Sequence, residues 1–351
     1  MKALITPFRP LSTKGGIETF SYYLTRAFPD LSIITNGDLS PRDKLLASFG
    51  QKTLNLIPYS FFVDNLFLKR SHKENFEVVF INGYYGWFFT LKKLKVPTVV
   101  IFHGCNIGVA EYALKDYKKI IYCYHKYYLG LFDYLSAKGK TVVVSVSSMV
   151  QYLLKKHYGI DSIVIPNCVD IEYFKPSTKE SARELLNLPI DKEIVLSVSA
   201  SYRKGFNVVL ELAKRKPNSL FIVISQSKIN ITPKNMLVFS DVPDTQMPLF
   251  YSAADYLVFP SRYEGFSIAA LEAMACDLPI ITSDMGAFYG MDYSQPFGRV
   301  LPLSATIEEY EKATVEVFND RSLHPRSFVQ QNFTLDIFIK NYRNLVRSVL
   351  L

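Results

Sequence analysis

Two glutamates, Glu264 and Glu272, flank the start of a predicted helix that begins near Ser267. Gly265 permits a tight turn into this helix, because glycine has no side chain. The first N–H groups of a helix lack partners within it, and together with the helix dipole they form an anion site that fits a diphosphate. The two carboxylates could hold hydroxyls at the two ends of one ligand, at about 1.5–3 kcal/mol each. An ordinary helix with a solvated glutamate at each end would show the same pattern.

Short apolar runs that alternate with helical segments supply the elements that would position these residues. Most of the runs are continuous in Val, Ile and Leu, which is typical of parallel strands covered by helices on both faces. In such sheets ligands bind at the carboxyl ends of the strands, where this chain carries Gly, Ser, Asn or His. We expect strands at residues 2–6, 32–35, 78–82, 98–103, 141–145 and 162–165, and at residues 194–199, 220–225, 236–239, 256–259 and 280–282.

The segment Pro166-Asn167-Cys168-Val169-Asp170 marks a predicted domain boundary, because a strand ends there and a new helical stretch follows at residues 180–186. A chain of 351 residues is long enough for two domains. We therefore expect two α/β domains with doubly wound parallel sheets, over residues 1–168 and 169–334. Apolar residues recurring over residues 335–351 predict a C-terminal helix that packs back on the first domain.

The segment from Glu264 to Glu272 resembles the Glu-x7-Glu motif of glycosyltransferase family 4, whose members have the GT-B fold. Four further stretches resemble landmarks of that family in the same order, so that the resemblance runs from Lys2 to about Phe333. These stretches are Gly15-Gly16-Ile17-Glu18, His103-Gly104, Pro166-Asn167-Cys168-Val169-Asp170 and Arg203-Lys204-Gly205. The resemblance implies two Rossmann-like domains facing across a cleft, the first binding the acceptor and the second binding a nucleotide sugar.

The resemblance also implies a role for each matched residue in holding the donor. Glu272 would bind the ribose, and Lys204 would neutralise the diphosphate leaving group, with Arg203 as a second positive charge in a shifted position. Gly15 and Gly16 would let the backbone approach the donor phosphate closely, since no Cβ intervenes. The residues whose backbone groups would face the sugar and the phosphate are Gly265, Phe266, Ser267 and Ile268.

His103 and Glu264 are the catalytic residues that the resemblance implies. Glu264 would contact the transferred sugar, and His103 would lie beside the sugar and the acceptor and assist through its backbone carbonyl or its ring. Breaking the bond from the anomeric carbon to a diphosphate builds negative charge on the leaving oxygen, which fixed N–H donors and a lysine stabilise without reorganising. In the reaction that the resemblance implies, the anomeric configuration is retained.

No metal and no cofactor are expected at this site. The sequence has no Asp-x-Asp triplet to hold a metal-bound diphosphate, and its four cysteines include no Cys-x-x-Cys pair. Dehydrogenases and P-loop hydrolases are disfavoured, because the glycine fingerprints of both are missing. The chain departs from the family at Ser199-Ala200-Ser201-Tyr202, which replaces the usual Gly-Arg, at Cys168 in the hinge, and in the segment Met285-Gly286-Ala287-Phe288-Tyr289-Gly290. These departures leave the donor identity and a non-catalytic binding role open.

The net charge of +8 is unevenly distributed along the chain. Residues 1–168 hold 21 Lys and Arg against 11 Asp and Glu, which gives +10, whereas residues 169–351 hold 19 against 21, which gives −2. A basic first half next to a near-neutral second half predicts that the first half meets something anionic.

A helical projection of residues 115–135 sharpens this expectation. It places Ile120 and Leu131 on one apolar face, and Lys119, His125 and Lys126 on the opposite face. The pattern fits either a core helix with a solvated basic face or a surface that meets anionic lipid headgroups. Residues 59–73 form a second aromatic and basic stretch in the same domain.

These observations together predict an enzyme that moves a hexose from a nucleoside diphosphate sugar, with UDP or GDP, to a glycolipid, a lipid-linked oligosaccharide or a polysaccharide precursor. The alternatives are a transferase with a small soluble acceptor and a non-catalytic subunit that binds sugar nucleotides. Nucleic-acid binding is not expected, because no corresponding motif is present. The first residues are broken too early for a signal peptide and no run of 18 apolar residues occurs, so we expect a cytoplasmic protein with peripheral contact to the membrane through its N-terminal domain.

Overall fold

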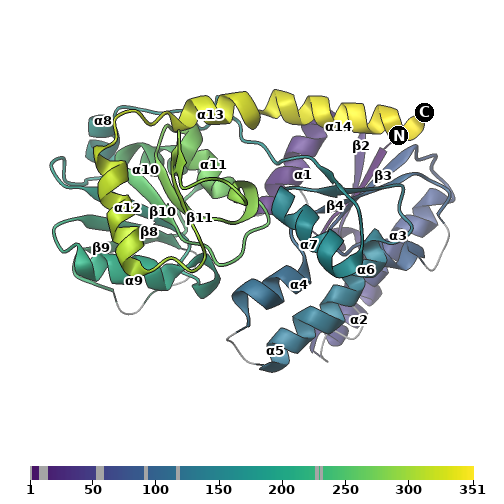
Figure 1. The fold of residues 1–351 in the computed structure, drawn as a ribbon. Coiled ribbons are helices and arrows are strands. Elements are labelled where there is room, and N and C mark those ends of the chain that lie inside the picture. Colours follow the sequence, from purple (N-terminus) through teal and green to yellow (C-terminus); the bar gives the residue numbers. More distant parts are fainter. Residues whose placement is uncertain are drawn as a thin grey trace. The chain divides into compact units, whose positions relative to one another are not determined.

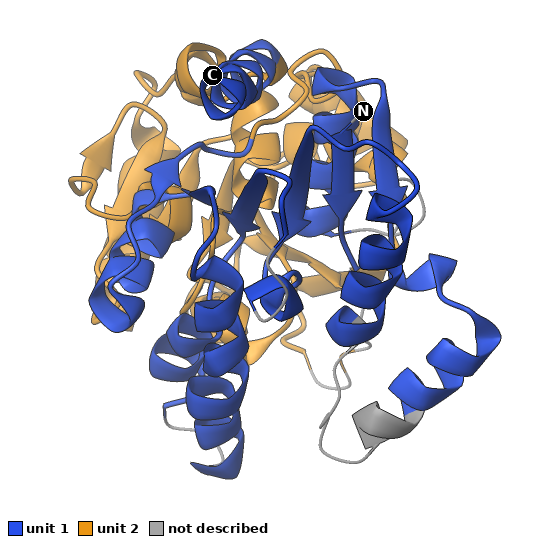
Figure 2. Cartoon of the chain, turned by 90° about the vertical axis from the view of Figure 1, so that its right-hand side faces the viewer, with its two compact units in different colours: residues 1–167, 336–351 blue, residues 168–335 orange. Residues whose placement is uncertain are grey.

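The computed structural model describes residues 2–7, 15–52, 59–90, 94–115, 119–225, 229 and 232–351, with only the backbone described for residues 49–52 and 59. The chain divides into two compact units (Figure 2). We call residues 1–167 with 336–351 unit 1, and residues 168–335 unit 2. The division falls one residue from the boundary that the sequence suggested.

Unit 1 contains a six-stranded sheet in which each strand runs parallel to its neighbours (Figure 1). The strand order is β2-β1-β3-β4-β5-β6. Every residue of β3 and β4 is buried, as expected for central strands with both faces covered. The strands are β1 (Lys2–Ile5), β2 (Leu31–Ile34), β3 (Val78–Asn82), β4 (Thr98–Phe102), β5 (Val142–Ser145) and β6 (Ile163–Val164).

Helical segments connect these strands, because parallel neighbours require a crossover. A clear example is α7, which begins after Ser147, whose hydroxyl accepts from Val150 N at 3.2 Å, and ends at the left-handed Gly159. The α-helices of unit 1 are α1 (Gly16–Ala27), α2 (Pro41–Lys52), α3 (Tyr59–Ser71), α4 (Asn106–Gly108), α5 (Lys119–Cys123), α6 (Gly130–Ala137), α7 (Ser148–Tyr158) and α14 (Leu335–Leu350). Two 3-10 turns, η1 (Asn36–Asp38) and η2 (Trp87–Thr90), and two π-helical turns, η3 (Val109–Ala113) and η4 (Tyr124–Leu129), complete it.

The C-terminal helix α14 belongs to unit 1, although it follows the whole of unit 2 in the sequence. The rings of Phe338 and Tyr342 lie 5.6 and 5.7 Å from that of Phe20 on α1. Arg343 Nε donates to the carbonyl of Ala27 at 3.2 Å. The helix therefore covers α1 with aromatic side chains that are almost fully buried.

The segment projected as one amphipathic α-helix over residues 115–135 is not a single α-helix. Residues 116–118 lie outside the described part of the chain, and the remainder is α5, the π-helical turn η4 and α6. A π-turn adds a residue per turn and shifts the side chains that follow, so the projection failed. Ile120 and Leu131, which it placed on an apolar face, are 75% and 50% exposed. His125, which it placed on the basic face, is partly buried and lies 3.2 Å from Asn106 Oδ1.

Unit 2 contains a seven-stranded sheet with the order β12-β13-β11-β10-β7-β8-β9, in which only the short β12 is antiparallel to its neighbour. Strands β12 and β13 were missed from the sequence, because Pro296 and Gly298 interrupt the apolar pattern there. Gly298 is required in β13, since a Cβ at this position would lie 1.9 Å from Ile280 O. The strands are β7 (Ile194–Val198), β8 (Leu220–Ser225), β9 (Met236–Ser240), β10 (Tyr256–Phe259), β11 (Ile280–Ser283), β12 (Ser294–Gln295) and β13 (Gly298–Leu301).

The core of unit 2 lies between its sheet and the helices α9 and α12. Val195 and Val258 of the sheet pack in one cluster with Val209 and Leu212 of α9 and Ala313 of α12. The α-helices of unit 2 are α8 (Lys179–Leu185), α9 (Phe206–Arg215), α10 (Met247–Ala253), α11 (Ile268–Ala275), α12 (Ile307–Asn319) and α13 (Pro325–Asn332). The 3-10 turns are η5 (Tyr202–Lys204), η6 (Asp244–Gln246) and η7 (Gly286–Phe288).

The predicted architecture of two parallel-sheet α/β domains is confirmed. Each of the strands expected from the sequence is present, with its ends displaced by no more than one residue. Within the described ranges, no helix combines the length and the apolar character that crossing a membrane requires.

Candidate functional site

Most residues assigned to donor binding lie in unit 2, in the loops after β7 and β10 and on α11, and the loop after β11 borders them. These strands are adjacent and parallel in the sheet, so their carboxyl ends lie along one edge. Lys204 lies on η5 after β7, and Glu264 lies in the loop after β10. Gly286 lies on η7 after β11. The edge of the sheet therefore brings together residues as far apart in the chain as Lys204 and Gly286, which are 82 positions apart.

Lys204 and Glu264 form an ion pair at this edge. The side chains are 20% and 8% exposed, so both charges are largely removed from water. Ser261 Oγ donates to the same carboxylate at 3.0 Å, and Lys204 Nζ lies 5.1 Å from the centre of the Phe259 ring. Because each buried charge has a partner, the pair is stable as a unit, and an anion that approached Lys204 would have to compete with Glu264.

The turn that carries Lys204 is packed directly on the loop that carries Glu264. Gly205 has a φ of 74°, and a Cβ there would lie 1.9 Å from Pro260 O, so only glycine fits. The backbone N–H of Arg262 donates to Arg203 O at 2.9 Å. The exposed Arg203 side chain donates to Tyr263 O at 3.2 Å and thus lies against the same loop.

The loop after β10 leads into α11, which begins at Ile268, one residue after the expected start. Ser267 adopts a left-handed backbone with a φ of 90°, which costs a non-glycine residue about 1–3 kcal/mol. Ala270 N donates to Ser267 O at 3.2 Å, so the N–H groups that have no carbonyl one turn earlier in the helix are those of Ile268 and Ala269. Such strain commonly lies at ligand sites, and here it sets the direction of the helix start.

The neighbouring loop after β11 closes on Phe266. Ala287 N donates to Phe266 O at 3.0 Å. Gly286 has a φ of 59°, and a Cβ there would lie 2.9 Å from Phe266 O. The backbone at Gly265, Phe266, Ser267 and Ile268 is therefore held between two strand-end loops and the helix start.

Glu272 is held apart from Glu264, although the two share one sequence motif. Its carboxylate accepts from the Tyr251 hydroxyl of α10 at 2.9 Å. Burial raises the pKa of Glu272 to about 7, while the bond from Tyr251 lowers it and the charge of Asp244 raises it. Tyr251 is fully buried and was missed from the sequence, where nothing around it suggested a contact with the motif.

In unit 1, His103 follows β4 and lies in a buried polar cluster. Its Nε2 is 3.0 Å from Asn82 Oδ1, and the Asn82 amide nitrogen is 3.1 Å from both Thr6 Oγ1 and Ser21 Oγ. The Phe20 ring meets the His103 ring edge to face at 4.5 Å. Burial lowers the pKa of His103 to about 3, so the imidazole is neutral. Asn82 was not named from the sequence, although the polar residues at the strand ends were noted.

The predicted glycine loop is only partly within the described residues. Gly15 precedes α1 and Gly16 is its first residue, whereas residues 8–14 lie outside the described part. A Cβ at Gly15 would lie 2.2 Å from a carboxylate oxygen of Glu18 in the first turn of α1. The close approach of a donor phosphate to these glycines stays a prediction.

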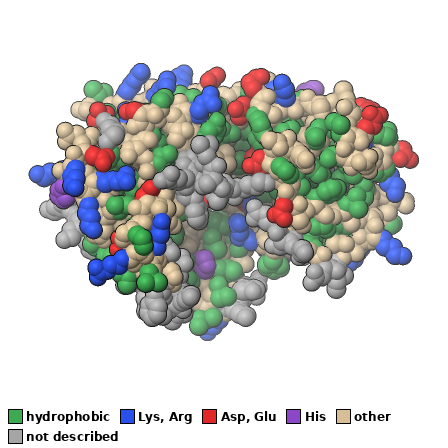
Figure 3. Space-filling view, turned by 180° about the vertical axis from the view of Figure 1, so that it is seen from behind, with side chains coloured by type: hydrophobic (Ala, Val, Ile, Leu, Met, Phe, Trp, Pro, Cys, Tyr) green, Lys and Arg blue, Asp and Glu red, His purple; other side chains and the backbone are tan. Residues whose placement is uncertain are grey.

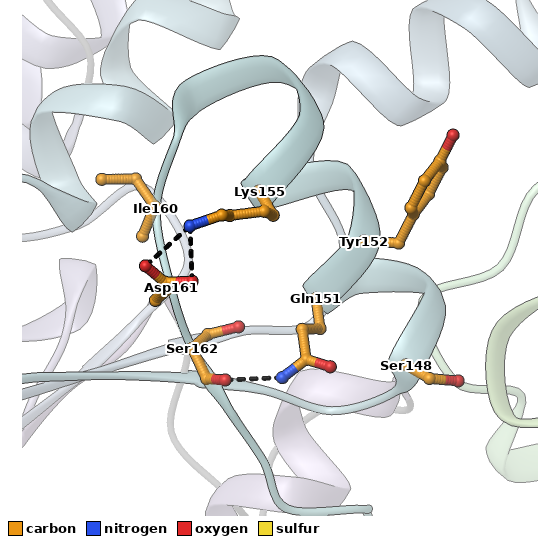
Figure 4. A pocket seen from close by; sticks show the side chains of 7 residues that line it. All are labelled: Ser148, Gln151, Tyr152, Lys155, Ile160, Asp161 and Ser162. Carbon is orange, nitrogen blue, oxygen red and sulfur yellow. Dashed lines mark hydrogen bonds and ion pairs between the residues drawn. The ribbon is translucent and has the colours of Figure 1, made fainter.

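A surface pocket of about 370 Å³ lies elsewhere in unit 1, between α7 and the segment leading into β6. None of the predicted site residues lines it. In Figure 4, Lys155 reaches Asp161 at 2.8 Å and Gln151 donates to the Ser162 carbonyl at 2.6 Å. Its polar groups are thus directed at one another, and the strand-end edges remain the better candidates.

No cluster of three or more His, Cys, Asp or Glu residues that could hold a metal ion occurs within the described ranges. The free cysteines Cys105, Cys123, Cys168 and Cys276 form no disulfide.

Two family models match the chain. Residues 14–173 match the model described as Glycosyltransferase Family 4, and residues 178–291 match the model described as Glycosyl transferases group 1. The chain is 30% identical over 200 residues to TuaC of Bacillus subtilis strain 168, assigned to teichuronic acid biosynthesis as a glycosyltransferase. That match covers 55% of this chain and 48% of TuaC, so the chain matches about half the length of this relative.

Solved structures show the same fold over the whole chain. The sucrose-phosphate synthase of Thermosynechococcus elongatus is 18% identical, with a TM-score of 0.78 over 99% of this chain and 98% of that one. Anabaena HepE in complex with UDP-glucose is 14% identical, with a TM-score of 0.73 over 99% of both chains. At these identities the likeness concerns the fold, which is GT-B.

Proposed function

We propose that this chain, which belongs to the family 4 and group 1 glycosyltransferases of GT-B fold, transfers a hexose from a nucleoside diphosphate sugar with retention of configuration. The observation that carries the proposal is the meeting of Lys204, Glu264 and the start of α11 at one sheet edge of unit 2. A cation and the N–H groups at a helix start suit a diphosphate, and the adjacent carboxylate suits sugar hydroxyls.

Each residue then has a defined part in the reaction. Lys204 and the first N–H groups of α11 stabilise the negative charge that develops on the diphosphate as the anomeric bond breaks. Glu264 orients the hexose, and Glu272 accepts hydrogen bonds from the ribose hydroxyls. The HepE complex with UDP-glucose, a protein of the same fold, supports the choice of a nucleotide sugar as donor. The resemblance to family 4 supports retention.

The donor can be found with a thermal-shift screen against UDP, GDP, ADP and the corresponding glucose conjugates. A ligand that binds only the folded state raises the unfolding temperature, and a concentration 100 times its Kd adds about 2.7 kcal/mol of stability. We expect one nucleoside diphosphate and its sugar to do so. If the folded chain binds none of them, the proposed function is wrong.

We further propose that the acceptor is a glycolipid, a lipid-linked oligosaccharide or a polysaccharide precursor at an anionic membrane. Ile120, Tyr127 and Leu131 are exposed by 75%, 65% and 50% along the helical run 119–137. Lys119 on this run and Lys138 directly after it are exposed, and unit 1 carries the basic charge of the chain. Figure 3 shows Lys and Arg side chains among hydrophobic ones on the side of unit 1, at its left. Apolar side chains beside lysines match the two chemistries of an anionic lipid surface, at about 1 kcal/mol per lysine.

Sedimentation with vesicles tests this contact. Vesicles containing an anionic lipid should retain the chain at low salt and release it at high salt, because the Debye length shortens. Replacing Ile120 and Leu131 with serine should weaken retention, whereas Leu185→Ser, at an exposed leucine of unit 2, should not. Absence of binding at low salt would remove the membrane from the proposal and favour a small soluble acceptor.

A non-catalytic sugar-nucleotide-binding subunit is the second candidate, and one observation favours it. The segment Ser199-Ala200-Ser201-Tyr202 replaces the Gly-Arg that is usual in the family, and Ser199 has a left-handed backbone with a φ of 83°. This segment thus holds no cation of its own, and the shifted Arg203 donates to Tyr263 O at 3.2 Å. Hydrolysis of the bound sugar nucleotide separates the candidates, because a binding subunit retains the ligand intact.

A further inference from the structure

We propose that Asn82 is a positioning residue that holds the His103 ring as its Nε2–H tautomer and so leaves Nδ1 as a hydrogen-bond acceptor for a sugar hydroxyl. The tautomer is argued from unit 1 alone. The identity of the ligand rests on the proposed function.

The cluster stands at the carboxyl ends of neighbouring strands. Thr6 follows β1, Asn82 is the last residue of β3, and His103 follows β4. Strand β3 pairs with both β1 and β4. Ser21 approaches the same point from α1. The Asn82 side chain is 1% exposed and joins the three other polar residues, so it is the centre of the cluster.

The hydrogen bonds determine which way the Asn82 amide points. Ser21 Oγ donates to the Ile17 carbonyl of its own helix at 2.7 Å, so its one hydrogen is engaged and its oxygen accepts. The Asn82 atom 3.1 Å from Ser21 Oγ must therefore be the NH2 group. Its other atom, Oδ1, faces His103 Nε2 at 3.0 Å. A carbonyl oxygen only accepts, so Nε2 carries the hydrogen.

The other ring nitrogen is consequently an unprotonated acceptor. Nδ1 is buried and has no hydrogen-bond partner among the described residues. The Phe20 ring, 4.5 Å away and fully buried, opposes rotation of the imidazole, so the two nitrogens cannot exchange places easily. Buried polar atoms without a partner are rare, and ligands of parallel sheets bind at the carboxyl ends of the strands, which is where His103 lies.

The lone pair on Nδ1 selects the kind of group that can bind. A sugar hydroxyl can donate to it, whereas the oxygens of an ionised diphosphate only accept and are repelled. In the Nδ1–H tautomer, Nδ1 would be a donor and would favour the diphosphate oxygens instead. Asn82 thus assigns hydroxyl recognition to the His103 ring without touching the sugar itself.

Nitrogen NMR of the uniformly ¹⁵N-labelled full chain tests the tautomer directly. The His103 signals are identified by their loss in His103→Gln. We expect Nδ1 to appear as an unprotonated nitrogen and Nε2 as a protonated one. Replacing Asn82 with leucine, which has a similar shape, should give averaged signals for two exchanging tautomers. Asn82→Asp should leave both nitrogens protonated at pH 7, because a carboxylate stabilises the imidazolium.

If the Asn82 variants fail to fold, two serine variants still test which tautomer His103 adopts. Ser21→Ala removes the oxygen that dictates the amide orientation, so the amide can turn and the second tautomer should appear. Ser71→Ala is the control, because Ser71 Oγ makes the same kind of bond to its own helix, to Leu68 O at 2.8 Å. Ser71→Ala should leave the His103 signals unchanged. A protonated Nδ1 in the unmodified chain, or signals unchanged in Ser21→Ala, overturns the proposal.

Binding of UDP-, GDP- and ADP-glucose, each compared with its nucleoside diphosphate, tests the consequence. Ser21→Ala and Asn82→Leu should weaken the conjugate that binds by about 5- to 10-fold, the loss of one hydrogen bond, and leave the nucleoside diphosphate unchanged. If the variants weaken the binding of the conjugate and of the nucleoside diphosphate equally, the proposed role of His103 in sugar recognition is wrong. If the unmodified chain binds none of these ligands, the proposed function fails, and the NMR result still decides the tautomer.

Discussion

The candidate residues of unit 2 are charged and paired with one another, whereas those of unit 1 are neutral and joined through an amide. In unit 2, Lys204 and Glu264 neutralise each other in a largely buried place. In unit 1, Asn82 connects His103 to two hydroxyl groups, and no ion pair is involved. A charged pair can exchange its partner for an incoming anion, while a neutral network fixes the direction of a hydrogen bond. The two arrangements suit a diphosphate and a hydroxyl respectively.

The largest effect should come from breaking the ion pair in unit 2. Lys204→Met leaves Glu264 buried without its partner, so we expect the free energy of unfolding to fall by about 3–5 kcal/mol. The double variant Lys204→Met with Glu264→Gln should recover most of this loss. Chemical denaturation measures both values. Lys214→Met, at an exposed lysine on α9, is the control and should change stability by less than about 0.5 kcal/mol.

A backbone change at the same turn should have the next largest effect. Gly205→Ala introduces a Cβ into the space of Pro260 O and an unfavourable φ, so we expect a loss of about 2–4 kcal/mol. Gly159→Ala also acts at a left-handed residue, the end of α7, but nothing lies within 4 Å of its Cβ. This substitution should lower the free energy of unfolding by only about 1 kcal/mol. Equal losses in the two variants would contradict the close packing of η5 on the loop after β10.

Glu272 should give unit 2 a stability that falls as the pH rises. Its pKa is raised to about 7 in the folded chain against 4.5 ordinarily, so the folded state binds more protons between these values. Between pH 5 and 7 this amounts to about 2–3 kcal/mol. Glu272→Gln should remove that part of the slope in denaturation curves measured across pH. A slope identical to that of the unmodified chain would show that the carboxylate is ionised throughout.

His103 should give unit 1 a stability that falls as the pH drops, the opposite of the pH dependence expected from Glu272. The change in stability should be smaller in the pH range from 6.5 to 5. The pKa of His103 is lowered to about 3 against 6.5, so the unfolded state binds more protons and stability falls as the pH drops below 6.5. Between pH 6.5 and 5 we expect about 1–2 kcal/mol. His103→Gln should abolish this loss, and His324→Gln should not. A His103 signal that titrates near pH 6 would contradict the neutral cluster.

The sequence predicted the elements of the fold correctly where burial alone determines the pattern of apolar residues. Continuous apolar runs such as residues 78–82 and 98–102 predicted the central strands, because both faces of these strands are covered. The edge strand β12 and its neighbour β13 were not predicted, since they are short and interrupted by Pro296 and Gly298. The segment at residues 115–135 was wrongly projected as one α-helix, because a π-turn follows from packing and leaves no periodic signal.

The residues of the candidate site also fall into two groups, those in local motifs and those that act through distant partners. Glu264, Glu272 and Lys204 were accessible because they lie in local motifs next to a turn and a helix start. Asn82 and Tyr251 were not, because each acts through a partner distant in the sequence: Asn82 lies 61 residues from Ser21, and Tyr251 lies 21 residues from Glu272. Such partners are brought together by strand order and helix packing, which a single sequence does not display.

The return of the chain to unit 1 at α14 has a consequence for biosynthesis. A ribosome that makes this chain finishes every residue of unit 2, which ends at Leu335, before it makes the aromatic residues that cover α1. Phe20 therefore cannot pack against Phe338 and Tyr342 until these residues are made, more than three hundred residues later. During that interval nascent unit 2 has its whole sequence, whereas nascent unit 1 exposes an aromatic surface. A nascent chain stalled before residue 336 should thus depend on chaperones through unit 1.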